Sequence, residues 1–263
     1  MAANSSHCKV RIVSLAPNVT SILLELGVGR ELVGVSKWCK DIADVGQRPQ
    51  VGDCWKMDVD EVMRLKPTVL IGSVPFAPDT VAKILQESVT FAAINPRSLA
   101  DIERDIFTLG RIANRAASAD KLILKMRRGF KNIARAARQN RPTRRPRIYC
   151  EAWPRPRISS PPWVAELVEI AGGRMLGATG ARVSDDEIAR EDPDVIVLAW
   201  AATGDRAKAA TALRNPAWQN VTAIKKGHVF VIRDELLNTP GPPLLEGAWE
   251  LLRVIHDVQE KNV

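Results

Sequence analysis

The sequence predicts an α/β protein with two three-layer α/β/α lobes, whose mostly parallel sheets are joined by a single long interlobe helix. Strand-like and helix-like segments alternate along the chain, which favours parallel sheets covered on both faces. One helix–proline–strand unit occurs twice, and a long amphipathic segment separates its two copies. We therefore expect an N-terminal lobe over residues 9–115, an interlobe helix over 116–141 and a C-terminal lobe over 142–263.

The internal repeat is the strongest structural signal. The segments DEVMRLKPTVLI (60–71) and DEIAREDPDVIV (186–197) align without a gap. Each has an acidic pair, spaced apolar residues, a proline and then a strand-like run. The alignment predicts that the same local unit is built in both halves.

The segment 118–139 predicts the long helix. Its apolar residues recur in steps of three and four, with Lys and Arg over the remaining face. At 1.5 Å per residue the helix is roughly 33 Å long. A rigid spacer between two similar halves favours small motion on ligand binding over a clamshell closure.

The remaining elements follow from apolar runs and from the residues that end them. Long or proline-rich loops are expected over 36–55, 152–162 and 233–243. We expect strands at 10–15, 32–35, 68–72, 89–94, 147–151, 194–198 and 229–232, and further helices at 20–26, 58–66, 81–86, 99–113, 163–171, 207–213 and 244–258.

Composition bounds the class of protein. The net charge of +8 is concentrated in 127–147, where a solvated linker is favoured over contact with nucleic acid. The four cysteines show no C-x-x-C spacing, and free thiols are favoured over a Cys39–Cys54 pair. No apolar run approaches the roughly 20 residues that span a bilayer. No signal peptide is visible, so we expect either a cytoplasmic protein or one whose leader was removed.

Enzyme signatures are mostly absent. The sequence contains no G-x-G-x-x-G after its first strand, no phosphate-binding G-x-x-x-x-G-K-[ST] and no G-x-S-x-G. The three histidines, His7, His228 and His256, are far apart and in unlike contexts. We expect neither a catalytic nor a metal site, and no intrinsic cofactor.

Tryptophan is the residue that suggests a binding site. There are seven tryptophans and one tyrosine, and several tryptophans fall at or just beyond predicted strand ends. Ligands of open parallel sheets bind outside the carboxyl ends of the strands, and flat apolar rings suit a large, rigid ligand. Ligand contact is favoured for Trp38, Trp55 and Trp153, contact and packing are equally open for Trp163 and Trp200, and a structural role is expected for Trp218 and Trp249.

Two further loops complete the candidate site. Phe76 lies in the loop that follows the 68–72 strand. The loop from Asp234 to Asn238, followed by Pro240-Gly241-Pro242, offers polar groups for hydrogen bonding, with a plain turn as the alternative.

The sequence resembles the class III solute-binding proteins of ABC importers, and within them the cobalamin-binding receptors. The resemblance covers about residues 10–257 and is carried by VRIVSLAPNVTSILLELGVGRELVGVS, MDVDEVMRLKPTVLI, RIYCEAWPRPRISSPPWVAELVEIAGG, DPDVIVLAW and NPAWQNVTAIKKGHVFVI. It implies a ligand held in an interlobe cleft and delivered to a membrane permease driven by a separate ATPase. It also implies a periplasmic or other extracytoplasmic location.

The resemblance implies roles for particular residues. Pro17 and Asn18 match the family's first-strand exit, and Trp38 and Trp55 match aromatic positions of its loops. Asp234 matches a polar ligand contact, whereas Asn238 stands where the family would suggest a basic side chain.

Docking onto permease arginines is the second implied role. Asp60 resembles the docking acid of one lobe. The repeat suggests Asp186 or Glu187 for the other lobe, and ordinary solvated helix starts remain the alternative for all three.

The leading hypothesis is a non-enzymatic, monomeric receptor for a corrinoid such as cobalamin, with an ABC permease as partner and no nucleic acid. A ferric siderophore or haem receptor of the same fold is the alternative ligand class. Siderophores usually require clustered Arg and Tyr, and the loops offer mainly Arg97, Arg155 and Arg157. A cytoplasmic corrinoid-handling protein is the alternative from another functional class.

Overall fold

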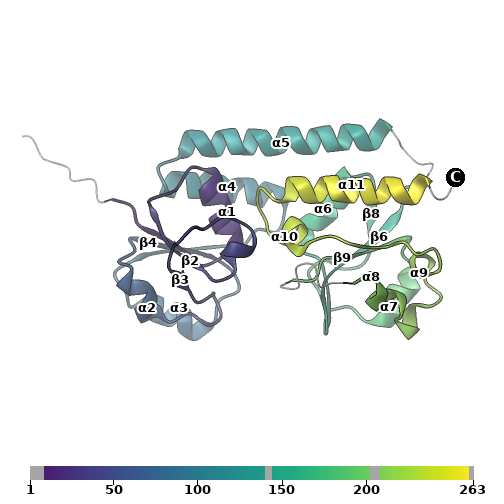
Figure 1. Ribbon diagram of the computed structural model, residues 1–263, viewed down its shortest axis with the longest axis horizontal. Helices are drawn as coiled ribbons and strands as arrows, with labels where there is room; N and C mark the ends of the chain where they lie inside the picture. Colours follow the sequence, from purple (N-terminus) through teal and green to yellow (C-terminus); the bar gives the residue numbers. More distant parts are fainter. Residues whose placement is uncertain (1–8, 140–143, 202–207, 261–263) are drawn as a thin grey trace, which may run out of the picture. The chain divides into compact units, whose positions relative to one another are not determined.

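The computed structural model describes residues 9–139, 144–201 and 208–260, in which the chain forms two compact units (Figure 1). Unit 1 comprises Met1–Pro96 and Glu103–Ile123, and unit 2 comprises Arg97–Ile102 and Leu124–Val263. Each unit is an α/β body with its own mostly parallel sheet, so the predicted fold class is confirmed. None of the described helices is both long and apolar enough to cross a bilayer.

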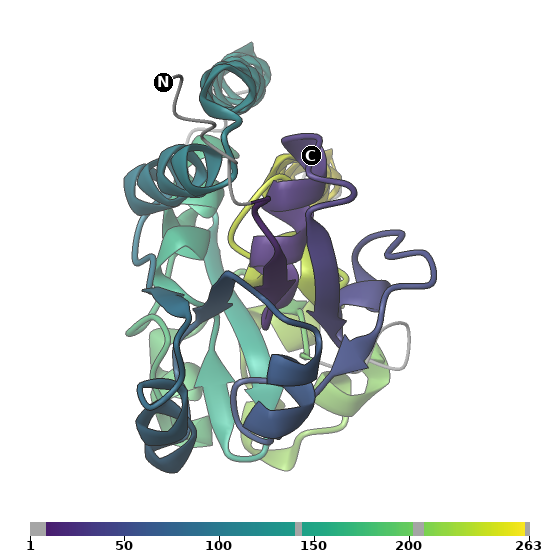
Figure 2. The same cartoon turned by 90° about the vertical axis from the view of Figure 1, so that its left-hand side faces the viewer.

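Unit 1 contains a fully parallel five-stranded sheet in the order β3-β2-β1-β4-β5. Figure 2 looks onto this unit and shows the twist of its purple-to-blue strands. The strand order reverses between β1 and β4, which makes the carboxyl ends of these two strands a topological switch point. The strands are β1 (Ile12–Ser14), β2 (Leu32–Ser36), β3 (Gln50–Val51), β4 (Val69–Ser73) and β5 (Thr90–Ile94).

Alternation of side chains along the strands gives this sheet two buried faces. Val13, Leu15 and Leu70 point into a core that is closed by α2 (Val59–Arg64) and α3 (Pro78–Ile84). The helix α1 (Pro17–Glu25) contacts β1, β2 and β4, and it lies on the other side of the sheet in Figure 1. A 3₁₀ turn, η1 (Cys39–Asp41), packs against α1.

Unit 2 has a five-stranded sheet in the order β10-β9-β6-β7, and β8 also pairs with β6. All pairings are parallel except the hairpin of β6 with β7. The order reverses between β6 and β9, which is the switch point of this unit. The strands are β6 (Arg147–Pro154), β7 (Arg157–Ser159), β8 (Arg174–Met175), β9 (Val195–Leu198) and β10 (Val229–Val231).

The helices of unit 2 cover this sheet and surround its strand ends. The helices α6, α10 and α11 pack together, and the cluster around buried Trp218 fills the space under α7 and η3. The elements are α6 (Pro162–Ile170), α7 (Asp185–Glu191), α8 (Ala209–Leu213), η3 (Pro216–Trp218), α9 (Thr222–Lys225), α10 (Asp234–Asn238) and α11 (Leu244–Glu260).

The predicted repeat is confirmed in three dimensions. The two copies form α2–β4 in unit 1 and α7–β9 in unit 2. The residue before the proline takes a left-handed conformation in both copies, with φ of 51° at Lys66 and 43° at Asp192. The same local chemistry therefore ends the helix and starts the strand in each half.

Two long helices have residues in both units. The helix α4 (Leu99–Ile112) begins in unit 2 and ends in unit 1, whereas α5 (Ala116–Gln139) belongs to unit 1 as far as Ile123 and to unit 2 from Leu124. The stripe predicted for α5 is confirmed, because Ala119, Leu122, Met126 and Ile133 are all buried.

Several local expectations were wrong. The exit of β6 is a hairpin with β7, because the strand continues through Trp153 to Pro154. The loop 234–238 is the short helix α10, which begins with two acids that suit a helix N-terminus. Trp249, expected to be structural, is 48% exposed on α11, whereas Trp218 is fully buried as expected.

Other expectations lie partly outside the described residues. Residues 140–143 of the predicted linker, His7, Cys8, residues 202–207 and the domain boundary at 142 belong to this group.

Candidate functional site

The candidate site of unit 1 lies at the carboxyl ends of its strands. Pro17 and Asn18 open α1 directly after β1, Trp38 follows β2, and Trp55 follows β3. Because the strands are parallel, these residues gather along one edge of the sheet. Pro17, Asn18 and Trp38 thus follow strands that the sequence predicted, whereas β3 before Trp55 was not predicted, and ligand contact by these residues stays a prediction.

Asp53 organises the two exposed tryptophans of this edge. Its Oδ2 accepts a hydrogen bond from Trp38 Nε1 at 2.9 Å, and its Oδ1 accepts from the backbone N–H groups of Trp55 and Lys56 at 3.0 Å. Lys37 Nζ lies 3.6 Å from Asp53 and 4.8 Å from the centroid of the Trp38 ring. Asp53 therefore fixes the Trp38 ring and the backbone of Trp55, and the two side chains remain 41% and 60% exposed.

The ionisation of Asp53 follows from these contacts. Burial opposes the charged form, but the hydrogen bonds from Trp38, Trp55 and Lys56 outweigh it, so the pKa of the Asp53 carboxyl is lowered. The charge that anchors both loops is therefore present at neutral pH.

Asn18 is a buried residue with an unmet donor at the unit 1 switch point. It is 4% exposed, and its Nδ2 has no hydrogen-bond partner within the described structure. A buried polar atom without a partner costs free energy, so its presence suggests a partner that arrives from outside.

Phe76 is placed differently from the two tryptophans. Its ring packs edge-to-face on Phe91 at 5.2 Å between centroids, beside the core of unit 1. Gly72 makes room for it, since a Cβ there would lie 2.5 Å from Phe76 Cζ. These contacts favour packing, and ligand contact by Phe76 stays a prediction.

Cys39 and Cys54, the cysteines of unit 1 within the described residues, are free and buried. Cys39 Sγ accepts a hydrogen bond from Thr20, and Cys54 Sγ donates to Leu15 O. Burial raises the pKa of Cys39 and raises that of Cys54 to about 11, so neither is an activated thiolate.

The candidate site of unit 2 is built on Glu151, which sequence reasoning missed. Its side chain is fully buried, and Glu151 is the last residue of β6 that pairs with β9, next to the switch point. It accepts hydrogen bonds from Tyr149 Oη at 3.0 Å, from Trp200 Nε1 at 2.8 Å and from Arg157 Nη1 at 2.9 Å. An acid at the end of an otherwise apolar strand, RIYCE, was the signal that could have indicated it.

The network continues from Glu151 to the start of α7. Arg157 Nε donates to Asp185 at 2.7 Å, and the Arg157 guanidinium lies 4.2 Å from the centroid of the Trp218 ring. Burial raises the pKa of Glu151, and Arg157 acts in the opposite direction. Arg157 is therefore the main charge that stabilises the buried carboxylate.

The tryptophans of unit 2 divide into an exposed one and two buried ones. Trp153 is 39% exposed, with its Nε1 on Arg155 O. Trp163 is buried with its Nε1 on Leu237 O at 2.9 Å, and Trp200 is buried on Glu151. The contacts favour packing for Trp163 and Trp200, and Trp153 keeps the open ring surface expected of a ligand contact.

Asn238 carries an unmet acceptor at the unit 2 switch point. Its Nδ2 donates to Ala199 O, the residue after β9, at 2.7 Å, which fixes the orientation of the amide. Its Oδ1 is buried and has no hydrogen-bond partner within the described structure. Asp234 begins the same short helix, α10.

The three predicted docking acids differ in their surroundings. Asp60 lies exposed in the first turn of α2, and Asp186 is its exposed counterpart on α7. Glu187 closes a capping box, since its Oε2 accepts from Ser184 N at 2.7 Å. Among the residues described, no three His, Cys, Asp or Glu side chains gather as metal ligands.

This architecture, two α/β units with aromatic and unsatisfied polar residues at their switch points, is that of a binding protein. The chain belongs to the periplasmic binding protein family, whose model matches residues 12–236.

Two curated relatives and one solved structure show what the chain is similar to. It is 26% identical over 256 residues to an ABC transporter substrate-binding lipoprotein of Bacillus subtilis, covering 94% of this chain and 80% of the relative. It is 26% identical over 259 residues to a cobalamin-binding protein of Halobacterium salinarum, covering 94% and 69%. The apo structure of a periplasmic haem-binding protein from Roseiflexus sp. RS-1 superposes with a TM-score of 0.81 at 20% identity, covering 95% and 99%.

The chain thus has the fold and family of substrate-binding proteins of ABC importers, and the predicted family is confirmed. The interlobe cleft stays a prediction, because the chain forms two separate units whose relative placement is not determined.

Proposed function

We propose that this protein is a non-enzymatic, extracytoplasmic receptor that binds an amide-bearing corrinoid and delivers it to an ABC importer. The observation that carries the proposal is the amide of Asn238. Its donor is used on Ala199 O, and its buried acceptor has no partner in the described structure. The site therefore calls for a ligand that brings hydrogen-bond donors.

The chemistry of tetrapyrroles separates the two ligand classes. Corrinoids carry peripheral carboxamides, which offer both N–H donors and carbonyl acceptors. The propionates of haem are ionised at neutral pH and offer acceptors alone. In unit 2, the N–H of a ligand carboxamide would satisfy Asn238 Oδ1, whereas an ionised propionate has no donor to offer it.

The exposed aromatic residues support a large, flat ligand. Trp38, Trp55 and Trp153 hold open ring surfaces at strand ends, which suit the apolar faces of a macrocycle. Tyr149, the single tyrosine, is buried against Glu151 and is not available as a phenolate ligand for iron. The relative named as a cobalamin-binding protein adds support for a corrinoid, and the haem-binding structural neighbour makes haem the second candidate.

The ligand test is a titration with cyanocobalamin, followed by tryptophan fluorescence and calorimetry, with haemin titrated in parallel. We expect quenching and saturable heat at micromolar corrinoid. The Asn238→Ala variant should bind about tenfold more weakly, the effect of one lost hydrogen bond. The matched control is Asn220→Ala, which removes an exposed amide outside the strand ends.

The outcomes of this titration separate the alternatives. Binding of haemin in place of cyanocobalamin would transfer the proposal to a haem receptor. No signal with either tetrapyrrole would reject both ligand classes. An unchanged affinity of Asn238→Ala would remove the role given to its amide.

For delivery, we propose Asp60 and Asp186 as the docking acids. They occupy equivalent positions of the repeat, and both are exposed in the first turn of a helix. Glu187 is held by its capping box, and Asp185 is paired with Arg157. The structure thus favours Asp186 over the other acid that the sequence left open.

Charge reversal at Asp186 tests this docking. We expect Asp186→Lys to keep wild-type ligand affinity and to lower stimulation of the importer's ATPase in proteoliposomes by more than tenfold, since close charge pairs are worth about 1.5 kcal/mol or more. Asp79→Lys on α3 is the matched control, because Asp79 is also an exposed acid in a first helical turn. Equal loss in both variants would point to net charge rather than to a docking contact.

A further inference from the structure

The helix α5 has a large excess of positive over negative charge. Its sequence, AASADKLILKMRRGFKNIARAARQ, contains seven basic residues and one acidic residue, a difference of six. The net charge of the whole chain is +8. The charge excess is therefore concentrated on one continuous element.

The charges lie on the side of the helix that faces away from the core. Lys121, Arg128 and Arg135 are seven residues apart, and so are Leu124, Lys131 and Arg138, which places both rows on neighbouring lines along the helix. All six residues are exposed.

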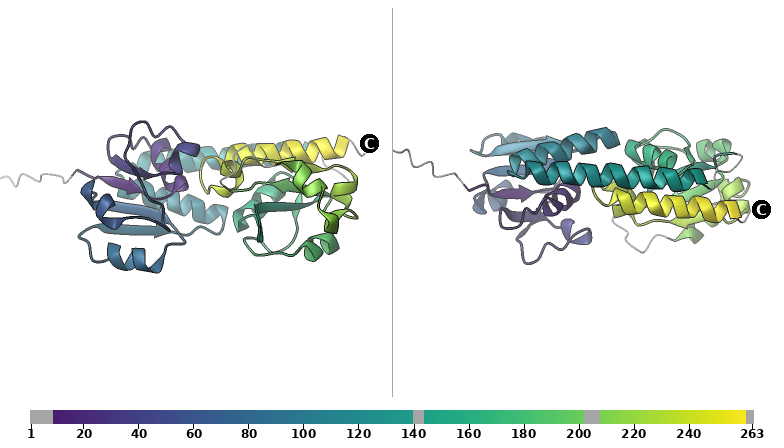
Figure 3. Two further views of the ribbon diagram at one scale, coloured as in Figure 1. Left: turned by 60° about the horizontal axis from the view of Figure 1, so that its bottom comes forward. Right: turned by 90° about the horizontal axis from the view of Figure 1, so that it is seen from above.

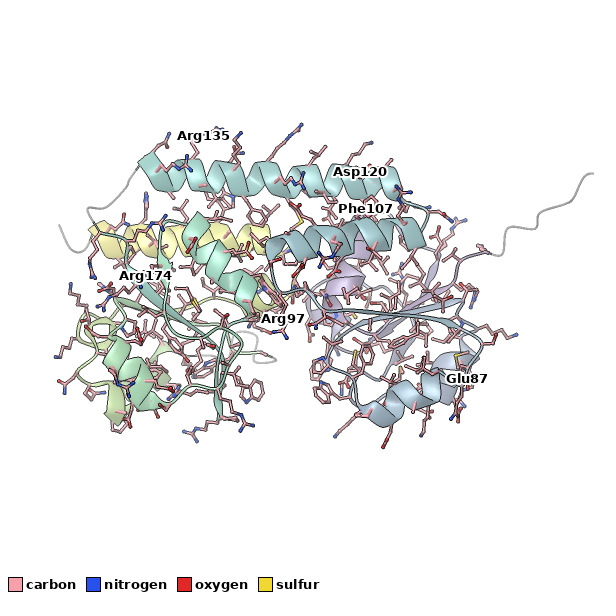
Figure 4. The ribbon with its side chains drawn as sticks, turned by 180° about the vertical axis from the view of Figure 1, so that it is seen from behind. Glu87, Arg97, Phe107, Asp120, Arg135 and Arg174 are labelled. Atoms are coloured by element: carbon pink, nitrogen blue, oxygen red, sulfur yellow. The ribbon has the colours of Figure 1, made fainter. Side chains whose placement is uncertain are left out.

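The exposure of α5 can be followed in two of the views. The right-hand view of Figure 3 shows no other element drawn across α5, and in Figure 4 the labelled Arg135 points away from the sheet of unit 2. We call Lys121, Arg128, Lys131, Arg135 and Arg138 the α5 basic face.

The acids in the described part of the chain do not neutralise these charges. Within the described ranges, no carboxylate forms an ion pair with any member of the α5 basic face. Other arginines of the chain are paired: Arg147 with Asp192 and Asp194, and Arg157 with Glu151 and Asp185. The row is therefore complementary to an external surface of negative charge.

We infer that the α5 basic face docks the protein onto a bilayer surface rich in anionic phospholipid. The row from Lys121 to Arg138 extends about 25 Å along a straight helix, which suits contact with a flat array of headgroups. Leu124, 48% exposed in the middle of the row, supplies an apolar side chain that can enter the interfacial region.

A bilayer explains this face better than nucleic acid does. Single-strand binding relies on aromatic side chains that stack on bases, and the exposed residues of α5 include no aromatic ring. Leu124 would gain no favourable contact from the phosphates of a nucleic acid, whereas a membrane interface can bury its apolar side chain.

The test is co-sedimentation of the full chain with vesicles. Pure phosphatidylcholine vesicles are compared with vesicles that contain about one-third phosphatidylglycerol, at low salt and at about 0.5 M salt. We expect sedimentation with the anionic vesicles at low salt and release at high salt. The triple variant Lys121→Gln/Arg128→Gln/Arg135→Gln should partition about a hundredfold more weakly, because each lost cation weakens binding roughly fivefold.

The control removes the same charge from elsewhere. Arg64, Lys83 and Lys225 are exposed on three other helices, and their triple replacement by Gln lowers the net charge equally. Circular dichroism and thermal unfolding check that both triple variants fold. Equal loss of binding in the control would overturn the inference, as would sedimentation with phosphatidylcholine alone.

Leu124→Gln separates the membrane from nucleic acid. It should weaken vesicle binding and leave retention by a DNA oligonucleotide unchanged. Tighter retention by DNA than by anionic vesicles at the same salt concentration would assign the basic face to nucleic acid and contradict the membrane. Since none of these measurements involves a corrinoid, their failure is distinct from a failure of the proposed function.

Discussion

Replacing Arg157 with methionine should lower the free energy of unfolding by about 3–5 kcal/mol, the cost of leaving a buried carboxylate without its counter-ion. Glu151 is fully buried, and Arg157 Nη1 lies 2.9 Å from its Oε2. After the substitution only the neutral donors of Tyr149 and Trp200 remain. Urea unfolding followed by tryptophan fluorescence measures the loss.

The loss should depend on pH in a defined direction. Burial already raises the pKa of Glu151, and removal of Arg157 raises it further. For an acid whose folded pKa exceeds its unfolded value, stability is fully present below the unfolded pKa and is lost as pH rises through the folded pKa. The deficit of Arg157→Met should therefore be smaller at pH 5 than at pH 8.

Two further variants make this result interpretable. Arg155→Met changes an exposed arginine in the same hairpin and should stay within about 0.5 kcal/mol of wild type. The double variant Glu151→Gln/Arg157→Met should regain part of the lost stability, because its buried amide carries no charge. If Arg157→Met were as stable as Arg155→Met, the buried pair would not be a stabilising element.

Replacing Gly247 with alanine should destabilise the protein by about 1–3 kcal/mol and weaken ligand binding more than tenfold. The Cβ added at Gly247 would collide with the backbone carbonyl of Leu236 and lie 2.8 Å from its carbon. The obstacle is backbone, so α10 or α11 must shift. Asn238 follows two residues later on α10, and its hydrogen bond to Ala199 O would be displaced.

Thermal unfolding and the cyanocobalamin titration measure these two effects. The control is Gly29→Ala, because a Cβ there meets no heavy atom within 4 Å and the backbone conformation is an ordinary one. It should leave both stability and binding close to wild type. Weaker binding by Gly247→Ala without a loss of stability would still agree with a role of α10 in ligand binding. Unchanged binding would contradict that role.

Sequence patterns predicted the elements well where the signal is local. The repeat gave the α2–β4 and α7–β9 units because each combines a helical stripe, a proline and an apolar strand within 12 residues. The stripe of α5 was equally clear, since its spacing depends on one helix alone. The strand end before Trp38 followed from the same local reasoning, whereas β3 before Trp55 and the extension of β6 through Trp153 were not predicted.

Contacts between distant segments were beyond the reach of sequence patterns. Asp53 accepts a hydrogen bond from Trp38, 15 residues earlier, and Glu151 accepts one from Trp200, 49 residues later. Burial of Trp163 requires Leu237 O, 74 residues along the chain. The 152–162 hairpin and α10 were also missed, because proline-rich and short segments read equally well as loops.

The sequence by itself determined the class of protein: two parallel α/β halves, a repeated unit in each, a long basic helix and tryptophans at strand ends. Hydrophobic periodicity and parallel pairing are local and general enough to be read without coordinates. Only the tertiary structure decided which polar atoms are satisfied. Trp200 and Trp163 donate to groups inside unit 2, and Glu187 takes part in a capping box. Among the residues that the structure describes, Asn18 Nδ2 and Asn238 Oδ1 are buried without partners. The satisfaction of a buried polar group depends on residues distant in sequence, and that pairing is fixed when the chain folds.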